Sequence, residues 1–184
     1  MGRTLTVRLL ALGLGFCVSG HWPLAAQSRS REEALAAVYR DAQVRPERVF
    51  LTPEQVQQVE SRAGTDAPSP LVARYVATES GQIVGRAYVE THTVRTKRES
   101  LLISLDAQGR VLRVDVTAFL EPPEFRAPEA WLDQYRGHGL DDDLAVDRAI
   151  RPIAGATLTA NAANGAVRRV LAIDEVLRNV GGGR

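Results

Sequence analysis

The chain has 184 residues, of which 45% are hydrophobic and 24% charged, and its formal net charge at pH 7 is +1. This size fits about one domain behind a leader, and the composition is ordinary for a globular protein with an apolar core. A nearly neutral chain without a clustered basic surface is untypical of nucleic-acid-binding proteins, so we expect no nucleic-acid partner.

The N-terminal residues have the order of a secretory signal. Arg3 and Arg8 precede the apolar run LLALGLGFCV over residues 9–18, and a polar stretch follows that ends in small residues at Ala25 and Ala26. The run is shorter than the roughly 20 residues that a membrane-spanning helix needs. We therefore expect residues 1–26 to be a cleaved signal peptide, with an uncleaved N-terminal anchor as the alternative. The mature protein is then expected in the periplasm or on the outer face of the cytoplasmic membrane.

Removal of the signal leaves a chain without cysteine, because Cys17 is the only one. The mature chain then has no thiol nucleophile, disulfide or iron–sulfur ligand. Its histidines, His92 and His138, lack the spacing of metal ligands, so we expect no metal site. A hydrolase is not favoured either, because no G-x-S-x-G motif and no nucleophile–base–acid set is present.

Residues 27–70 are expected to form N-terminal helices and a linker. Apolar side chains recur at helical spacing over residues 32–40, and residues 49–51 fit a short strand. Thr52 is typical of an N-cap and Pro53 of the first helical position, so a second helix is predicted to run to about Ala63.

The central part of the chain changes to strand patterns. Residues 74–78 and 83–89 flank a Ser80-Gly81 turn, and residues 101–105 and 111–118 flank the turn DAQGR. Two consecutive hairpins predict an antiparallel sheet of at least four strands. With helices at both ends, the expected fold is α+β, a single domain whose core spans residues 71–180.

A final helix is predicted from about Asn161 to Leu177. Its apolar face consists of Ala163, Ala166, Val167, Val170 and Leu177. Arg168, Arg169 and Glu175 are expected to face away from that surface. Asp174 falls within the apolar face, and the periodicity gives no reason for it.

The segment before this helix is the strongest candidate for a site. Gly155, Ala156 and Thr157 are small residues at a loop-to-helix junction, where backbone and ligand can approach closely. Thr159 and Asn161 add side-chain oxygens, and the unpaired amides of a helix start favour a phosphate. The alternative is that Thr159 or Asn161 merely caps an ordinary packed helix.

The stretch Gly155-Ala156-Thr157-Leu158-Thr159 resembles the S/T-G-A-T-x-T signature of the FMN-binding domain family. That family includes the extracytoplasmic flavin subunits of the Rnf electron-transport complex and of the sodium-pumping NADH:quinone reductase. Its members also have a Glu-Thr-Pro-Gly turn after a strand and then a short tryptophan-led helix. Glu121-Pro122-Pro123 and Trp131 occupy the corresponding places in the same order.

The resemblance implies an electron-transfer flavoprotein rather than a stand-alone enzyme. FMN would be attached by a flavin transferase through a phosphoester to Thr157, with its phosphate at residues 155–159. Leu158 and Trp131 would cover part of the flavin ring, and the turn of Glu121 and Pro123 would lie beside it. The partner would be a redox protein or a membrane electron-transport complex.

Three departures from the family pattern leave other interpretations open. Arg151 stands where the transferase pattern has an acid, Ala154 replaces a serine or threonine, and Glu124 replaces the glycine of the Glu-Thr-Pro-Gly turn. The alternatives are therefore a non-covalent FMN binder and a flavin-free exported interaction module of the same fold.

The charged turn of Arg95, Lys97 and Arg98 has two further interpretations. It could dock an acidic redox partner. It could instead protect a hairpin edge against strand pairing.

Overall fold

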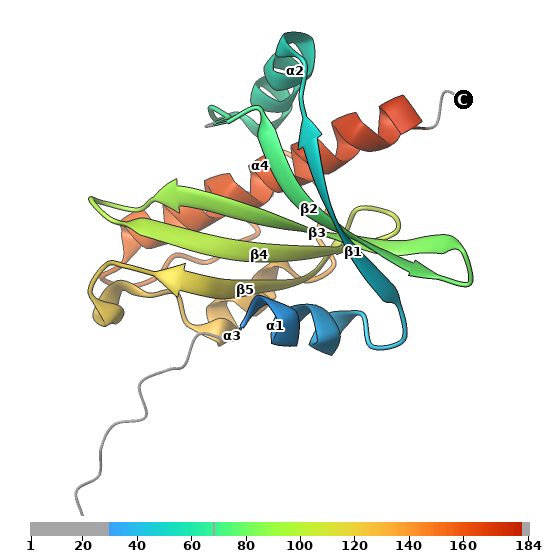
Figure 1. Ribbon diagram of the computed structural model, residues 1–184. Helices are drawn as coiled ribbons and strands as arrows, with labels where there is room; N and C mark the ends of the chain where they lie inside the picture. The colour runs from blue at the N-terminus through green and yellow to red at the C-terminus, as the bar shows by residue number, and fades with distance from the viewer. Residues whose placement is uncertain (1–29, 68, 182–184) are drawn as a thin grey trace, which may run out of the picture.

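The computed structural model describes residues 30–67 and 69–181 (Figure 1). The predicted signal peptide lies outside these residues. In chain order the elements are α1 (Arg31–Val38), β1 (Gln43–Phe50), α2 (Pro53–Ala63), β2 (Leu71–Glu79), β3 (Gln82–Thr93), β4 (Arg98–Asp106), β5 (Val111–Phe119), the 3-10 turn η1 (Pro123–Phe125), α3 (Glu129–Leu132), the 3-10 turn η2 (Asp133–Tyr135) and α4 (Thr157–Gly181). A search of this described part for a helix apolar and long enough to cross a bilayer finds none.

The strands form one antiparallel sheet in the order β1-β2-β3-β4-β5, with helices before and after it. This confirms the predicted α+β fold with a sheet of at least four strands. The first strand is longer than expected and begins at Gln43 instead of near Val49. Most side chains of β1 are exposed and the strand contains Pro46, so this edge strand has no apolar alternation by which the sequence could reveal it.

The second helix matches its sequence signals. The Thr52 hydroxyl accepts from the amide of Gln55, and the Gln55 side chain accepts from the amide of Thr52, which completes a capping box. Gly64 follows the helix with a φ of 67°, the left-handed conformation that glycine adopts at little cost.

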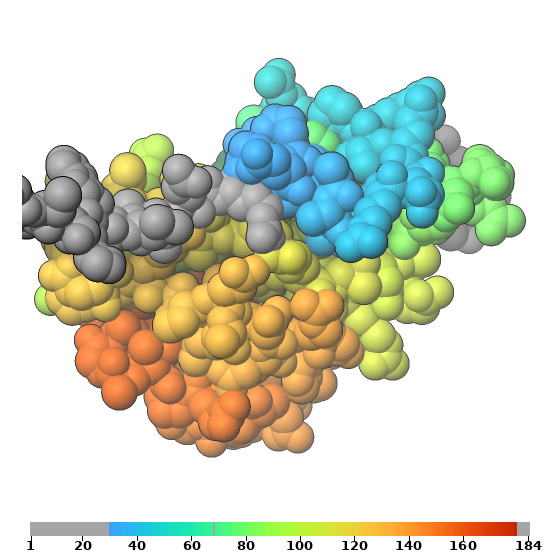
Figure 2. All heavy atoms as spheres, turned by 90° about the horizontal axis from the view of Figure 1, so that it is seen from below, coloured from blue at the N-terminus to red at the C-terminus, as the bar shows by residue number. Residues whose placement is uncertain are grey.

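The sheet buries apolar side chains on both faces, with α4 on one face and α1 on the other (Figures 1 and 2). The larger core lies under α4 and includes Tyr88, Leu101 and Ile103 of the sheet. The smaller core lies under α1 and includes Leu35, Tyr39 and Leu102. Alternate residues of β3 and β4 therefore belong to different cores, as expected from the two-residue period of a strand.

The last helix begins at Thr157, earlier than the predicted Asn161, and continues to Gly181. The prediction that Arg169 faces away from the core is wrong: this residue is only 8% exposed. Three residues of β3 explain the charges on the sheet-facing side of α4. Arg169 pairs with Glu90, and Asp174 accepts from Arg86 Nε at 2.6 Å and from the Tyr88 hydroxyl at 2.8 Å.

The other two charged residues of this helix are half-buried. Arg168 donates from Nε to the carbonyl oxygen of Ala63 at 2.8 Å and so attaches α4 to the end of α2. Glu175 pairs with Arg62 of α2 at 3.1 Å. Neither residue is fully exposed to solvent, because α2 packs beside α4.

Candidate functional site

The start of α4 presents Thr157 to solvent on a fixed backbone. Gly155 has a φ of 76° and open space where a Cβ would stand, so the chain turns sharply there and leaves room for a ligand. Ala156 is buried and accepts from the amide of Ala160 at 3.0 Å, which closes the first helical turn. Thr157 and Leu158 follow on the exposed side.

Helix geometry makes this place suited to an anion. The first amides of an α-helix have no intrahelical acceptor, and the helix dipole adds partial positive charge. Thr157 is the first residue of the long helix α4 and is exposed. A phosphate group fits such a position.

Thr159 has a structural role and is not part of the exposed surface. Its side chain is buried, and its hydroxyl donates to the carbonyl oxygen of Phe125 at 2.7 Å. Because Phe125 ends η1, this bond attaches the start of α4 to the segment that carries Pro123. The structure thus brings the G-A-T segment and the Glu-Pro turn together, although they are far apart in sequence.

Glu121 organises the turn between β3 and β4. One of its carboxylate oxygens accepts from the backbone amides of Arg95, Thr96 and Lys97, at 3.1, 2.7 and 2.8 Å. The amides of Thr96 and Lys97, followed by that of Arg95, hold the pKa of Glu121 below its ordinary value. Glu121 therefore acts as a cap for this turn.

Aromatic and apolar side chains connect these pieces into one surface. The guanidinium carbon of Arg95 lies 4.8 Å from the centre of the Phe125 ring, in a cation–π contact. Leu120 is 63% exposed and Leu158 is 53% exposed. We call the surface formed by residues 95–97, 120–125 and 155–158 the α4-start surface.

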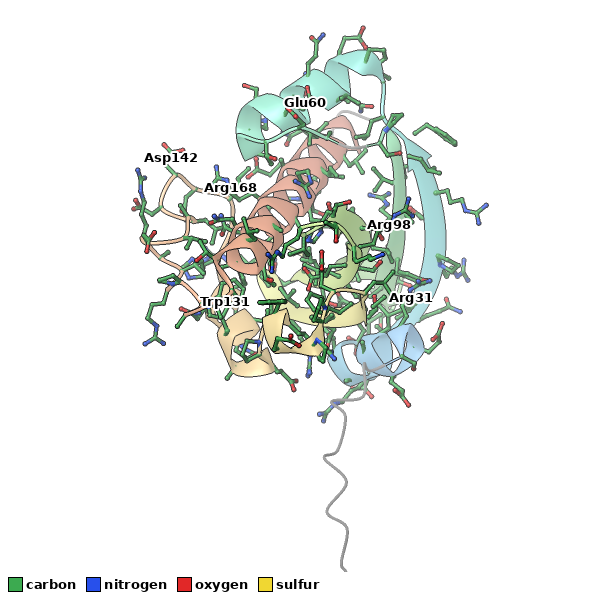
Figure 3. The ribbon with its side chains drawn as sticks, turned by 90° about the vertical axis from the view of Figure 1, so that its left-hand side faces the viewer. Arg31, Glu60, Arg98, Trp131, Asp142 and Arg168 are labelled. Carbon is green, nitrogen blue, oxygen red and sulfur yellow. The ribbon has the colours of Figure 1, made fainter. Side chains whose placement is uncertain are left out.

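Trp131 lies in the core below this surface. Its side chain is 8% exposed and packs edge-on against Tyr135, with ring centres 5.6 Å apart. Its indole nitrogen donates to the carbonyl oxygen of Arg151 at 2.5 Å. Figure 3 shows Trp131 pointing from α3 toward the interior. Trp131 thus fixes the segment that leads to Gly155.

A buried charge network that the sequence analysis did not predict lies on the α4 side of the sheet. The ring of His92 is held between two carboxylates, with Nδ1 at 2.6 Å from Glu90 and Nε2 at 3.1 Å from Glu99. Arg169 pairs with the other oxygen of Glu90. His92 and Glu99 face each other in the β3–β4 register, which the predicted strand bounds did not include.

The charges in this network shift one another's pKa. Burial lowers the pKa of His92, but the carboxylates of Glu90 and Glu99 outweigh it and raise the pKa to about 9. Burial raises the pKa of Glu90, but His92 and Arg169 outweigh it and hold the pKa below its ordinary value. The ring is therefore an imidazolium at neutral pH, held between Glu90 and Glu99.

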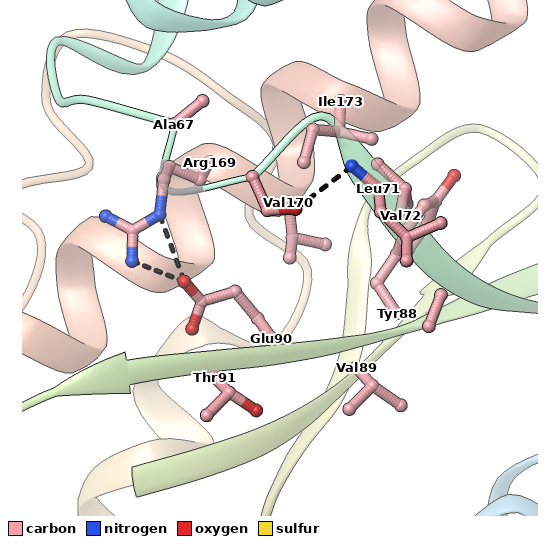
Figure 4. Close-up of a pocket in the computed structure, with 12 residues that line it drawn as sticks. Ala67, Leu71, Val72, Tyr88, Val89, Glu90, Thr91, Arg169, Val170 and Ile173 are labelled. Atoms are coloured by element: carbon pink, nitrogen blue, oxygen red, sulfur yellow. Dashed lines mark hydrogen bonds and ion pairs between the residues drawn. The ribbon is translucent and has the colours of Figure 1, made fainter. Parts of the chain in front are cut away.

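A cavity of about 270 Å³ adjoins this network, between α4 and strands β2 and β3 (Figure 4). Its walls are mainly apolar, and the Arg169–Glu90 pair lies at one end of it. Within the described residues, no group of three or more His, Cys, Asp or Glu side chains is placed to hold a metal ion.

The chain was compared with protein-family models, with curated proteins and with solved structures, and none of them matches.

Proposed function

We propose that this chain is an exported FMN-binding electron-transfer protein, with FMN attached through its phosphate to Thr157. The observation that carries the proposal is the position of Thr157. It is an exposed hydroxyl in the first turn of α4, directly after a backbone turn at Gly155 with open space beside it.

The residues of the α4-start surface fit the parts of FMN. The amides of the first helical turn and the exposed Arg151 suit a phosphate. Leu158 and Leu120 are exposed apolar side chains that suit the face of a flavin ring. Bound FMN would supply the redox chemistry, while the protein fixes its position and its access to solvent.

Attachment would change one bond of the protein. The Oγ1–H bond of Thr157 would be replaced by an Oγ1–P bond to the phosphorus of FMN, and the flavin transferase would break the P–O bond that joins this phosphorus to the leaving group of an activated flavin nucleotide. The leaving group of that nucleotide would carry away the proton. Thr159 could not serve as the acceptor, because its hydroxyl is buried and bonded to Phe125.

Arg151 supports a second candidate, a non-covalent FMN binder. Its backbone amide donates to the Gln134 side chain at 3.0 Å, and its carbonyl accepts from Trp131. The backbone of Arg151 therefore helps to hold the segment that leads to Gly155. A positive side chain here favours a phosphate but lacks the acid of the transferase pattern.

The test is the intact mass of the exported protein, produced together with a flavin transferase and measured after denaturation. We expect the mass of a chain cleaved near Ala26 plus one FMN, less one water. Thr157→Ala should abolish the addition, and Thr157→Ser, which keeps a hydroxyl, should retain it. An unmodified mass with yellow flavin released would favour the non-covalent binder. An unmodified, colourless protein would overturn the proposal.

A further inference from the structure

The cavity next to the Arg169–Glu90 pair continues into a second cavity of about 500 Å³. The two share Ser69, Thr91 and Arg169 in their walls, so they form one cleft with two different ends. We call it the β3 cleft. It does not include the start of α4, because Arg169 lies twelve positions beyond Thr157, or about 18 Å at 1.5 Å per residue.

One end of the β3 cleft is apolar. Its walls come from both strands and from α4 and include Leu71, Val72, Val89, Val170 and Ile173. Leu71, at the rim, is 44% exposed. A volume of 270 Å³ would hold about nine waters at roughly 30 Å³ each, and a methylene group is of similar size. This end has room for an apolar chain of about eight to ten carbons.

The other end is polar and carries a positive charge without an ionic partner. Thr65, Asp66, Thr93 and Arg98 line it together with His92 and Arg169. Arg169 is neutralised by Glu90, and His92 lies between Glu90 and Glu99. For Arg98, the described residues provide no ion pair. Among the residues that line this polar end, Asp66 has the one carboxylate, and its negative charge lowers the positive electrostatic potential there.

We propose that the β3 cleft binds an amphiphilic monoanion, with its carboxylate at Arg98 and its apolar chain between α4 and strands β2 and β3. Two features of the cleft match the two parts of such a ligand. The hydroxyl of Thr93 and the guanidinium of Arg98 are donors for a carboxylate, and the apolar end would remove the chain from water. The proposal does not depend on bound flavin.

The experiment measures binding to the whole protein by calorimetry, below the micelle concentration of each probe. Decanoate has the head and the chain, decanol has the chain with a neutral head, and acetate has the head alone. We expect decanoate to bind at least about tenfold more tightly than decanol, and acetate to bind too weakly to measure. Added salt should weaken the binding of decanoate and leave the binding of decanol unchanged, because only decanoate is charged.

Variants then locate the site. Arg98→Gln should reduce decanoate binding to the level of decanol, whereas Lys97→Gln in the same turn, outside the cleft walls, should not. Ile173 of α4 lines the apolar end and is half-buried, so Ile173→Trp should fill that end and abolish the binding of both chains. Each variant is first shown to unfold cooperatively, like the parent.

Three results would overturn the proposal. One is equal affinity for decanoate and decanol in the parent protein. Another is decanoate binding that Arg98→Gln leaves unchanged. The third is decanoate binding that persists in a folded Ile173→Trp variant, which would place the ligand elsewhere.

Discussion

Thr159 and Phe125 are separated by 34 residues, yet the hydroxyl of one donates to the carbonyl oxygen of the other at 2.7 Å. This bond joins the first turn of α4 to the segment after β5. Two residues earlier, Thr157 has the same kind of side chain on the exposed side of the helix. One threonine therefore supports the α4-start surface, and the other is available to a ligand.

This arrangement predicts that two similar substitutions differ in their effects on stability and on flavin attachment. Thr159→Val should lower the free energy of unfolding by about 1–2 kcal/mol, because the Phe125 carbonyl loses its donor. Thr157→Val should change it by less than about 0.5 kcal/mol, as usual for an exposed site, while abolishing flavin attachment. Urea unfolding of both variants tests this. A larger loss for Thr157→Val than for Thr159→Val would contradict it.

Asp174 is the second place where a single side chain holds two elements together. Its carboxylate binds Arg86 and Tyr88 on β3 and also Arg178 one turn later in α4, at 2.7 Å. Asp174→Asn leaves buried Arg86 without its counter-charge, so we expect a loss of about 3–5 kcal/mol in the free energy of unfolding.

The neighbouring residue provides the matched control. Glu175→Gln breaks only the partly exposed pair with Arg62 and should cost less than about 1 kcal/mol. Denaturant unfolding of both variants gives the comparison. Similar losses for the two would show that the Asp174 contacts do not hold α4 to the sheet.

His92 should make the stability depend on pH on the alkaline side. Its pKa is raised from 6.5 to about 9, so its contribution is fully present below pH 6.5 and is lost as the pH rises through about 9. The size of this contribution is roughly 3 kcal/mol at most, from 1.36 kcal/mol per pKa unit. We expect the free energy of unfolding to fall between about pH 6.5 and 9.5.

The variant His92→Gln should remove most of that slope, and His138→Gln should retain it, because His138 makes no ion pair within the described residues. Unfolding by guanidinium chloride at several pH values measures the slope. A slope that is equal in the parent and in His92→Gln would rule out the shifted pKa as its source.

Gly85 in β3 should tolerate no side chain. A Cβ at this position would stand 2.5 Å from the carbonyl oxygen of Leu105 and 2.5 Å from the ring of Tyr39. That ring is fixed, since its hydroxyl bonds to the carbonyl oxygens of Arg86 and Leu105 at 2.9 and 2.8 Å.

We therefore expect Gly85→Ala to lower the melting temperature markedly and to cost about 1–3 kcal/mol or more. Gly139→Ala is the control, because a Cβ there meets nothing within 4 Å. Thermal unfolding followed by circular dichroism distinguishes the two. A Gly85→Ala protein as stable as the parent would mean that Tyr39 can move aside.

The sequence alone determined the features that depend on neighbours in the chain. The cap at Thr52, the hairpin turns and the apolar period of α4 are local, and the structure confirms the α+β fold that they predicted. The same holds for Thr157, whose place near a helix start follows from its small neighbours. Strand β1 was underestimated because an edge strand with exposed side chains has no apolar period.

Only the tertiary structure decided what the charged residues of α4 do. From the sequence, Arg169 was expected to face away from the apolar side of the helix, and Asp174 had no explanation. In the structure both are buried against partners on β3. Helical periodicity assigns a charge to the solvent side because burying an unpaired charge costs several kcal/mol. That cost is offset when a distant strand supplies the opposite charge, and no pattern within the helix contains this information.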